Sequence, residues 1–499
     1  MTDQVSNAAV SETHSGVVFF VGDRAYKLKK PLDLGFLDFS TRERREHACH
    51  EEIRLNRRFA PDVYLGVSDV HGPDGDVCDH LVTMRRMPAD RRMSTLIEAH
   101  EPVEGALRDT ARVLAAWHAE APRGPQISAQ ETRDAVRSRW NDSFEQVRAL
   151  PDHGVARSAV TEIERLATTF LAGRDPLFEA RIADGRVVDG HGDLLATDIF
   201  CLDDGPRILD CLEFDEHLRW LDGLDDASFL AMDLEHLGAP DLAERFIGWY
   251  TEFAADPAPT SLRHHYVAYR AFVRAKVACL RHAQGDDHAA AEAREYSDLA
   301  LRHLRAGKID LILVGGLPGT GKSSLAGALA GRLGCTVLSS DRVRKELAGI
   351  SPEAPAATPY GTGIYTPEWS RRTYEELAGR AARLLQMGET VILDASWTDK
   401  TERDLIASVA RREHADLIPL RCDAPETLTA ERMRQRTQGI SDADTDIALA
   451  MTAHTAPWPE ATTIDTGGPL PAALERALPV VRPHGAELVW PRRPFLSPG

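Results

Sequence analysis

The sequence predicts two domains of different fold class: an N-terminal α+β domain and a C-terminal α/β domain built on a parallel sheet. Three observations predict this division. The chain has 499 residues, more than one hydrophobic core usually supports. Signals for an antiparallel hairpin open the chain, and long helical patterns follow them. From residue 309 onwards, short apolar strands alternate with helices, which is typical of a parallel sheet covered on both faces.

The N-terminal elements follow from hydrophobic periodicity. Alternation of apolar and polar residues predicts strands, and apolar residues recurring once per helical turn predict helices. In chain order we expect a hairpin of strands Val17–Phe20 and Ala25–Leu28 turning at Gly22-Asp23, a helix over Thr41–Ala60, strands Tyr64–Val70 and His80–Met87, a helical stretch over Ser94–Leu150, strands around Gly185–Asp210, and helices to about Ala306.

The C-terminal domain is predicted to begin just after the charged helical segment Ala289–Arg305. Ile309–Gly315 is a nearly unbroken apolar run, which indicates a strand buried on both faces. Helix and strand patterns then alternate to about Ile464. We therefore expect domains at 1–306 and 307–480, followed by an irregular, proline-rich tail at 481–499.

Composition and charge restrict the class of function. The formal net charge of -18 disfavours long nucleic acids and anionic membranes as partners, since both require a basic surface. The seven cysteines include no C-x-x-C pair, and their odd number argues against a disulfide framework or a zinc site. Neither a signal peptide nor an apolar run of membrane-spanning length is present, so we expect a cytoplasmic protein without a membrane anchor. Oligomeric state is not indicated.

The strongest motif is Gly316-Leu-Pro-Gly-Thr-Gly-Lys-Ser323, which matches G-x-x-x-x-G-K-[ST] between an apolar strand and a helix. Its glycines let backbone N–H groups turn toward phosphates, beside the positive end of the helix. Lys322 is predicted to reach the β- and γ-phosphates of ATP, and Ser323 to ligate Mg²⁺. The alternative is a glycine-rich turn without a ligand. The predicted nucleotide-binding residues are Gly316, Leu317, Pro318, Gly319, Thr320, Gly321, Lys322, Ser323 and Ser324.

Asp341 follows the second strand of this domain, where the carboxyl ends of parallel strands border the ligand crevice. Its carboxylate is a candidate general base for an attacking hydroxyl. Arg344, one helical turn later, is a candidate for holding an anionic group of the acceptor. The alternative for Asp341 is a helix N-cap, and both roles are compatible.

Two further positions complete this candidate site. Asp394 ends an apolar strand at the Walker-B position and is a predicted Mg²⁺ ligand, with strand-end capping as the alternative. Arg432 and Arg436 lie four residues apart on one helix face and are predicted to close over the phosphates as a lid. The alternative for these arginines is a solvated charged helix.

These motifs resemble the small P-loop kinases of the zeta-toxin and polynucleotide-kinase type, over about residues 308–480. The matching elements are the glycine-rich loop, the Ser339–Arg344 segment and the arginine-bearing lid. The resemblance implies that Asp341 acts as general base and that Arg344 positions the acceptor. It also implies a reaction type, phosphoryl transfer to a hydroxyl, while leaving the acceptor open.

A second constellation lies upstream. His191-Gly-Asp193 stands in a loop after a strand, Asp198 follows five residues later, and Asp210 ends a short hairpin. This arrangement supplies a proton acceptor and two metal ligands in kinase-like folds. It resembles the aminoglycoside-phosphotransferase family, whose loop reads H-G-D-x-x-x-x-N, and implies a bilobal protein-kinase-like domain with Asp193 catalytic and Asp198 and Asp210 binding Mg²⁺. Asp198 stands where that family has asparagine.

The resemblance extends to the N-terminal strands. Lys27 matches the phosphate-binding lysine, Glu52 its ion-pair partner, and Met84–Pro88 the hinge against adenine. Lys29 lies on the same strand face as Lys27 and is the alternative phosphate lysine.

Three hypotheses remain for the whole chain. The first is an ATP- and Mg²⁺-dependent kinase of small-molecule hydroxyls with two centres. The second keeps only the P-loop domain catalytic, with the N-terminal domain recognising substrate or regulating; Asp198 motivates it. The third is an ATP-driven switch, against which Asp341 and Arg344 argue because a switch needs no acceptor base.

Overall fold

The computed structural model describes residues 9–12, 16–32, 38–150, 154–351, 362–435, 451 and 455–482. Two compact units divide the chain. The first comprises Met1–Val160, Phe178–Ala258 and Tyr266–Ala300, and the second Thr161–Leu177, Pro259–His265 and Leu301–Gly499. The predicted domain boundary between residues 306 and 307 stays a prediction, and the second unit also takes in two segments from earlier in the chain.

The first unit contains a five-stranded antiparallel sheet in the order β1-β2-β3-β5-β4. Its strands are β1 (Ala9–Glu12), β2 (Gly16–Val21), β3 (Arg24–Lys29), β4 (Tyr64–His71) and β5 (Val77–Arg85). The hairpin predicted over 17–28 is β2 and β3, which pair antiparallel around the turn at Gly22 and Asp23. Strand β1 was not predicted, because all four of its residues are exposed and give no alternation.

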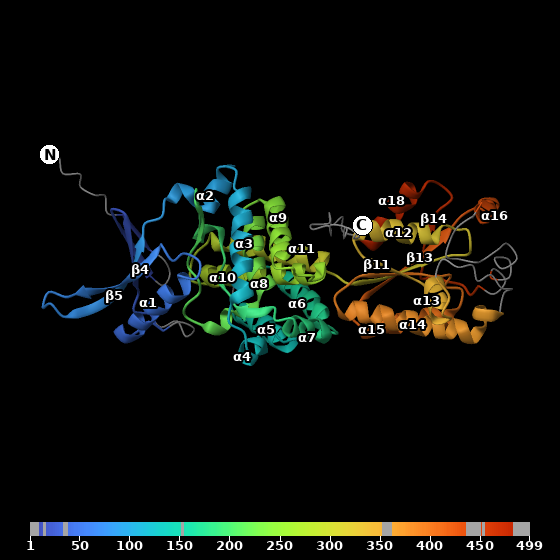
Figure 1. Ribbon diagram of the computed structural model, residues 1–499, viewed down its shortest axis with the longest axis horizontal. Coiled ribbons are helices and arrows are strands. Elements are labelled where there is room, and N and C mark those ends of the chain that lie inside the picture. The colour runs from blue at the N-terminus through green and yellow to red at the C-terminus, as the bar shows by residue number, and fades with distance from the viewer. Residues whose placement is uncertain are drawn as a thin grey trace. The chain divides into compact units, whose positions relative to one another are not determined.

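Helix α1 (Arg42–Asn56) packs on β4 and β5 in the first unit (Figure 1). It begins at Thr41, whose side chain accepts a hydrogen bond from the Arg44 N–H. Cys49 and Ile53 pack with Val82 in a buried cluster beneath the sheet. Because residues three and four apart share a helix face, this packing also turns Glu52 toward the sheet.

The helical part of the first unit was predicted as one long stretch over Ser94–Leu150. The structure divides it at Pro102 and at Gly124-Pro125, because proline cannot continue a helix. Its helices are α2 (Met93–Glu98), α3 (Glu104–Glu120), α4 (Pro125–Ala129), α5 (Arg133–Ala149), α8 (Gly223–His236) and α9 (Pro240–Phe253), with α6 (Arg157–Leu171), α7 (Asp175–Ala183), α10 (Thr260–Ala283) and α11 (Ala289–Ala306) crossing the unit limits.

Two small antiparallel sheets hold the loops that carry the upstream candidate residues. Strand β6 (Val187–Asp189) pairs with β9 (Trp220–Asp222). Strand β7 (Ile199–Leu202) pairs with β8 (Gly205–Ile208). A sheet-rich part bearing a lysine strand, followed by a helical part bearing these hairpins, is the protein-kinase-like arrangement that the motifs predicted.

The second unit contains a parallel sheet, as predicted; the sheet has five strands in the order β11-β12-β10-β13-β14. The strands are β10 (Asp310–Gly315), β11 (Thr336–Ser339), β12 (Val391–Asp394), β13 (Asp416–Asp423) and β14 (Thr462–Asp465). Helices α12 (Lys322–Leu333) and α18 (Leu470–Val481) cover one face, and α13 (Ser340–Leu347), α14 (Pro367–Gln386) and α15 (Lys400–Arg412) the other (Figure 1).

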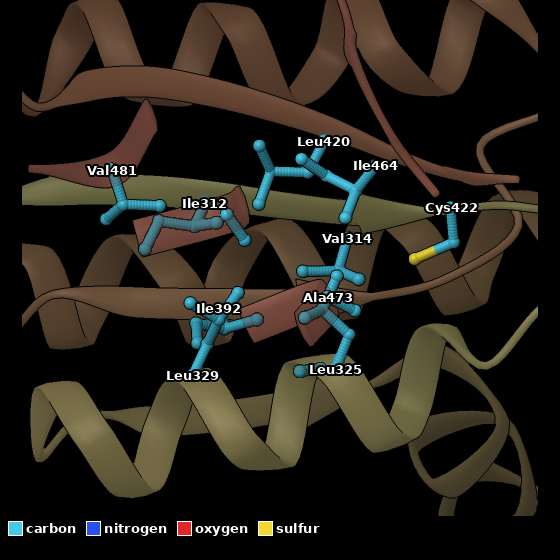
Figure 2. Close-up of a cluster of buried hydrophobic side chains, with 12 residues drawn as sticks. Ile312, Val314, Leu325, Leu329, Ile392, Leu420, Cys422, Ile464, Ala473 and Val481 are labelled. Carbon is cyan, nitrogen blue, oxygen red and sulfur yellow. The ribbon is translucent and has the colours of Figure 1, made fainter. Parts of the chain in front are cut away.

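The core of the second unit fixes the helix that follows the glycine-rich loop. Leu325 and Leu329 point from α12 toward Val314 and Ile392 on the sheet (Figure 2), and all four are fully buried. Burying a leucine side chain contributes about 1.5–3 kcal/mol. This packing holds the start of α12 at the carboxyl end of β10.

Some predictions lie outside the described residues: Arg436 and the tail from 483 to 499. In the described part of the chain, no helix combines the length and apolar character needed to cross a membrane.

Candidate functional site

The glycine-rich loop leaves the carboxyl end of β10 and enters α12 at Lys322. Two of its glycines leave no room for a side chain. A Cβ on Gly316 would lie 2.6 Å from Thr320 Oγ1, and one on Gly319 2.6 Å from the carbonyl oxygen of Thr429. Gly319 also has a φ of 81°, which disfavours other residues. The loop therefore keeps the bare backbone that a phosphate cradle needs.

The start of α12 presents unsatisfied donors. Gly321 is the N-cap and offers no side chain, and the Leu325 N–H donates to the Gly321 carbonyl at 3.0 Å. The N–H groups of the first turn therefore lack helical acceptors and favour an anion. Ser323 and Ser324 are exposed there, and Lys322 makes no hydrogen bond or salt bridge to the described residues. Lys322 is thus available to a ligand.

Strand register brings the carboxylates of the second unit to the same edge. Asp394 is paired with Val314 on β10 and with Ser339 on β11. Asp394 is buried at 6% exposure, and Asp341 lies two residues beyond Ser339. The carboxyl edge of a parallel sheet is where ligands bind in such folds.

Asp341 lies inside α13 rather than at its N-cap, which is Ser339. The capping alternative for Asp341 is therefore not what the structure shows. Arg344 Nη1 donates to Asp341 Oδ1 at 2.9 Å, and the guanidinium lies 4.8 Å from the centre of the Tyr365 ring. Arg344 is 7% exposed, and its Nε has no hydrogen-bond partner among the described residues.

Sequence reasoning missed Glu402, in the first turn of α15. Burial raises its pKa to about 7, and the charge of Asp399 adds to this, while a hydrogen bond with Tyr374 and the charge of Arg344 oppose it. The spacing Asp399-x-x-Glu402 would be interpreted as a helix capping box, so no sequence signal separates it from an ordinary helix start. Glu402 adds a second carboxyl group within the electrostatic reach of Arg344.

Trp397 was also missed. It is 1% exposed with a φ of 54°, a left-handed conformation that costs a bulky residue about 1–3 kcal/mol. Its ring meets Tyr374 at a centroid distance of 5.3 Å, and its Nε1 has no partner among the described residues. Strain of this kind concentrates at functional sites. Trp397 and Tyr374 therefore mark a wall near Asp394 and Arg344.

Arg432 lies against the loop rather than in solvent. From α16 (Glu426–Gln435) it donates to the Gly319 carbonyl at 3.5 Å and to the Thr466 carbonyl at 2.9 Å. These bonds fix the helix beside the phosphate cradle. Whether Arg432 also contacts phosphates stays a prediction.

In the first unit, Lys27 contacts acidic residues from two candidate regions, Glu52 on α1 and Asp210 after β8. Its Nζ lies 3.0 Å from Glu52 Oε1 and 2.7 Å from Asp210 Oδ1. Burial raises the pKa of Glu52, but the positive charges of Lys27 and Lys29 outweigh it and lower that pKa. The charge of Lys27 likewise lowers the pKa of Asp210. The predicted lysine, glutamate and metal-ligand positions are therefore assembled.

Lys29 occupies a different environment. Its Nζ contacts Glu52 Oε2 at 2.7 Å and Glu213 Oε1 at 2.5 Å, and its side chain is 2% exposed against 13% for Lys27. This favours Lys27 as the lysine that faces a nucleotide and gives Lys29 a buried ion-pair role.

The aspartates of the upstream constellation lie close enough to perturb one another. Burial raises the pKa of Asp198 well above its ordinary value, and the charges of Asp210 and Asp193 raise it further. Burial also raises the pKa of Asp193 to about 6, against the charge of Arg274. Asp210 has a φ of 63°, and its N–H donates to the Tyr64 hydroxyl at 3.1 Å. Carboxyl groups that raise one another's pKa in this way are ionised together only where a cation offsets their repulsion.

Asp226, fully buried on α8, was not predicted but holds the loop before Asp193. It accepts hydrogen bonds from the N–H groups of His191 at 2.7 Å and Gly192 at 2.9 Å, and contacts His118 Nε2 at 3.0 Å. Ionised acceptors make the stronger hydrogen bonds. In sequence, this residue is one of several acidic residues at a helix start and gives no distinct signal.

Among the described residues, no three His, Cys, Asp or Glu side chains converge as a ready-made metal site. Mg²⁺ usually takes only one or two carboxylates together with substrate phosphates. The pair Ser323 and Asp394, and the pair Asp198 and Asp210, fit that donor set.

Comparison with known proteins identifies the kind of domain that the second unit contains. The AAA domain family matches residues 311–457, which include the glycine-rich loop, Asp341 and Asp394. The second unit therefore contains a P-loop nucleotide-binding domain. An uncharacterized protein of Mycobacterium tuberculosis, Rv2004c, is 42% identical over 475 residues, which are 95% of each chain. Mb2027c of Mycobacterium bovis is equally similar. The chain belongs to the family of these mycobacterial proteins.

Several solved kinases resemble parts of the chain at TM-scores too low to carry an argument about activity. A complex of APH(2")-IIIa with GDP and kanamycin has a TM-score of 0.39 at 16% identity, over 60% of this chain and 94% of that one. A choline/ethanolamine kinase family protein from Mesorhizobium loti has 0.38 at 14%, over 60% and 93%. A sugar kinase from Janibacter sp. has 0.28 at 20%, over 37% and 99%.

Proposed function

We propose that the P-loop unit transfers the γ-phosphoryl group of ATP to a hydroxyl of a small molecule. The observation that carries this proposal is the Asp341–Arg344 pair at 2.9 Å, on the first turns of the helix after β11. A nucleotide switch needs no such pair. A phosphotransferase needs a carboxylate to accept the hydroxyl proton and a cation to orient the acceptor.

In this proposal the loop 316–321 and the first turn of α12 bind the phosphates. Lys322 stabilises the negative charge that develops on the transferred phosphoryl group. Ser323 and Asp394 would hold Mg²⁺, which offsets the charge on the phosphate oxygens. Arg344 would use its unpartnered Nε to hold the acceptor, and Trp397 and Tyr374 would exclude water from the same region.

A second candidate function belongs to the first unit. The Lys27–Glu52–Asp210 assembly favours a second phosphotransfer centre, with Asp193 as base and Asp198 and Asp210 as Mg²⁺ ligands. Asp198 in place of an amide adds negative charge beside the phosphates. That charge favours the alternative in which the first unit recognises substrate or regulates.

The test measures transfer from γ-labelled ATP to sugars, aminoglycosides, nucleosides and 5′-hydroxyl oligonucleotides. We expect Lys322→Ala and Asp341→Asn to lower kcat/KM for the accepted compound by about 10²–10⁴, the range of a phosphate clamp or a general base. Arg342→Ala, exposed beside Asp341, is the matched control and should change it little.

Each outcome separates the hypotheses. Transfer at the wild-type rate by Asp341→Asn contradicts the assigned base. ATP hydrolysis in which no acceptor gains phosphate favours the switch. If Asp193→Ala leaves every activity intact, the first unit is a recognition or regulatory module rather than a second kinase.

A further inference from the structure

A small pocket with a cavity volume of about 40 Å³ lies in the second unit, away from the glycine-rich loop. Lys308 and Ile309 just before β10, and Asp416 at the start of β13, line it. These residues mark the amino ends of the strands, whereas the glycine-rich loop follows their carboxyl ends. A cavity of this volume has room for a few water molecules, or for a small anion that replaces them.

Arg174 is the unusual side chain of this pocket. It is 0% exposed, and its Nη1 donates to the carbonyl oxygens of Glu413 at 2.9 Å and Gly173 at 3.2 Å. Its Nε and Nη2 are buried and have no hydrogen-bond partner among the described residues. A buried guanidinium is costly unless its donors and its charge are matched.

The charges around Arg174 do not match it. Arg165, which also lines the pocket, is held by Glu162 at 2.8 and 2.9 Å. Lys308 is paired with Asp416. The carboxylate of Glu413 accepts a hydrogen bond from Arg412 Nε at 2.7 Å. Burial lowers the pKa of Arg174 to about 10 against the attraction of Glu413, so Glu413 does not offset its desolvation.

The rest of the lining is partly apolar. Leu166, Phe170 and Leu304 contribute apolar surface. The Phe170 ring is stacked on the His265 ring at a centroid distance of 4.3 Å and an angle of 20°. Arg165 is exposed, so the pocket opens to solvent beside it.

We propose that this pocket binds the oxyanion group of a small ligand, a carboxylate or a phosphate, with Nε and Nη2 of Arg174 as a two-donor fork. These two nitrogens lie on one edge of the guanidinium, the geometry that accepts two oxygens of a carboxylate or phosphate at once. The site is separate from the ATP and acceptor sites, so it binds an additional ligand.

Titration calorimetry and thermal unfolding of the full chain test this site. The glycine-rich loop is first saturated with Mg²⁺ and a non-hydrolysable ATP analogue, so that it no longer takes the probe. Inorganic phosphate and acetate are then titrated separately, with chloride at matched ionic strength as reference. We expect one of these anions to bind and raise the melting temperature, which also distinguishes phosphate from carboxylate.

Two variants test the site in independent ways. Arg174→Met removes the fork, and Thr169→Phe fills the pocket while leaving Arg174; each should weaken anion binding at least tenfold. Thr168→Phe is the matched control, because Thr168 and Thr169 both donate to α6 carbonyls at 2.7 Å but only Thr169 lines the pocket. If neither anion exceeds chloride in the wild type, or Thr169→Phe binds as tightly as Thr168→Phe, the proposal is wrong. The comparison of Thr169→Phe with Thr168→Phe tests the proposal even if Arg174→Met does not fold.

Discussion

At the scale of single residues, the first unit concentrates charge on one buried carboxylate. Glu52 contacts Lys27 with one oxygen and Lys29 with the other. Removing one partner of a buried pair is more costly than replacing both, because it leaves an uncompensated charge. Glu52 therefore fixes two cations at different depths, one toward Asp210 and one toward Glu213.

Glu402 supports a pH prediction. Its pKa is about 7 in the folded protein, above the ordinary value of 4.5. The folded state therefore keeps a proton that the unfolded state has lost, and the resulting stability declines as pH rises from about 4.5 to 7. We expect Glu402→Gln to remove this decline and to be the more stable protein at pH 8, by about 1 kcal/mol.

Urea unfolding between pH 5 and pH 8 measures the effect. Glu375→Gln on the neighbouring helix α14 is the control, since its side chain is 59% exposed. A wild-type and a Glu402→Gln protein whose stabilities differ equally at both ends of this range would contradict the assigned burial of Glu402.

The residues of the P-loop site differ in how far sequence predicts them. Lys322 and Ser323 belong to a contiguous motif whose spacing follows from phosphate geometry. Glu402 and Trp397 reach the same region by tertiary packing, and neither stands in a pattern that differs from a helix start or a core aromatic. Only their surroundings in the folded protein, and not their spacing in the sequence, mark Glu402 and Trp397 as candidate site residues.

At the scale of elements, the glycine-rich loop and α16 form one packed unit. The Gly319 position faces the Thr429 carbonyl, and Arg432 bonds to the same turn of the loop. Any rearrangement of the loop therefore requires movement of α16.

Gly319→Ala tests this packing. The added Cβ meets a backbone oxygen at 2.6 Å and sits at a φ of 81°, so α16 or the loop must shift. We expect nucleotide affinity to fall at least tenfold and stability by about 1–2 kcal/mol. Titration calorimetry with an ATP analogue and thermal unfolding measure both.

Gly327→Ala is the matched control, because a Cβ there meets nothing within 4 Å in the interior of α12. It should leave affinity unchanged and stabilise the helix by about 0.5–1 kcal/mol. Equal affinities for the two variants would show that α16 does not constrain the loop.

Periodicity predicted most elements of both sheets, because their strands alternate or are apolar throughout. It did not predict β1, because the exposed residues of that strand carry no pattern. It also did not predict the helix breaks at Pro102 and Pro125, although the fact that proline interrupts helices would have predicted them. The parallel order of the second sheet was predicted only as a class, since strand order depends on contacts far apart in the chain.

At the scale of the whole molecule, four of the five limits between the two compact units fall inside helices, namely α6, α7, α10 and α11. Segments 161–177 and 259–265 belong to the second unit although they precede its sheet by many residues. Ser261 donates to the Gly388 carbonyl at 2.7 Å, and Arg174 to that of Glu413 at 2.9 Å. Local patterns do not encode such packing, so the boundary after residue 306 was drawn without these segments.

A fragment of residues 307–499 tests how much these segments matter. It lacks both hydrogen bonds and the apolar surface of α6 that packs in this unit, so we expect it to melt at least about 10 °C below the full chain or to be unfolded. Circular dichroism against temperature measures this. A fragment that melts with the full chain would show that residue 307 is a true domain start.

Asp226 has a consequence for how this family can diversify. Its carboxylate accepts hydrogen bonds from the backbone N–H groups of His191 and Gly192. Its side chain is fully buried, so a bound acceptor would not contact it. If Asp193 is the base of a second phosphotransfer centre, as proposed above, mutations of side chains that contact an acceptor would leave the backbone before Asp193 in place. On that proposal, the geometry of the base and the choice of acceptor could evolve as separate traits, with selection altering the second while the first is inherited unchanged.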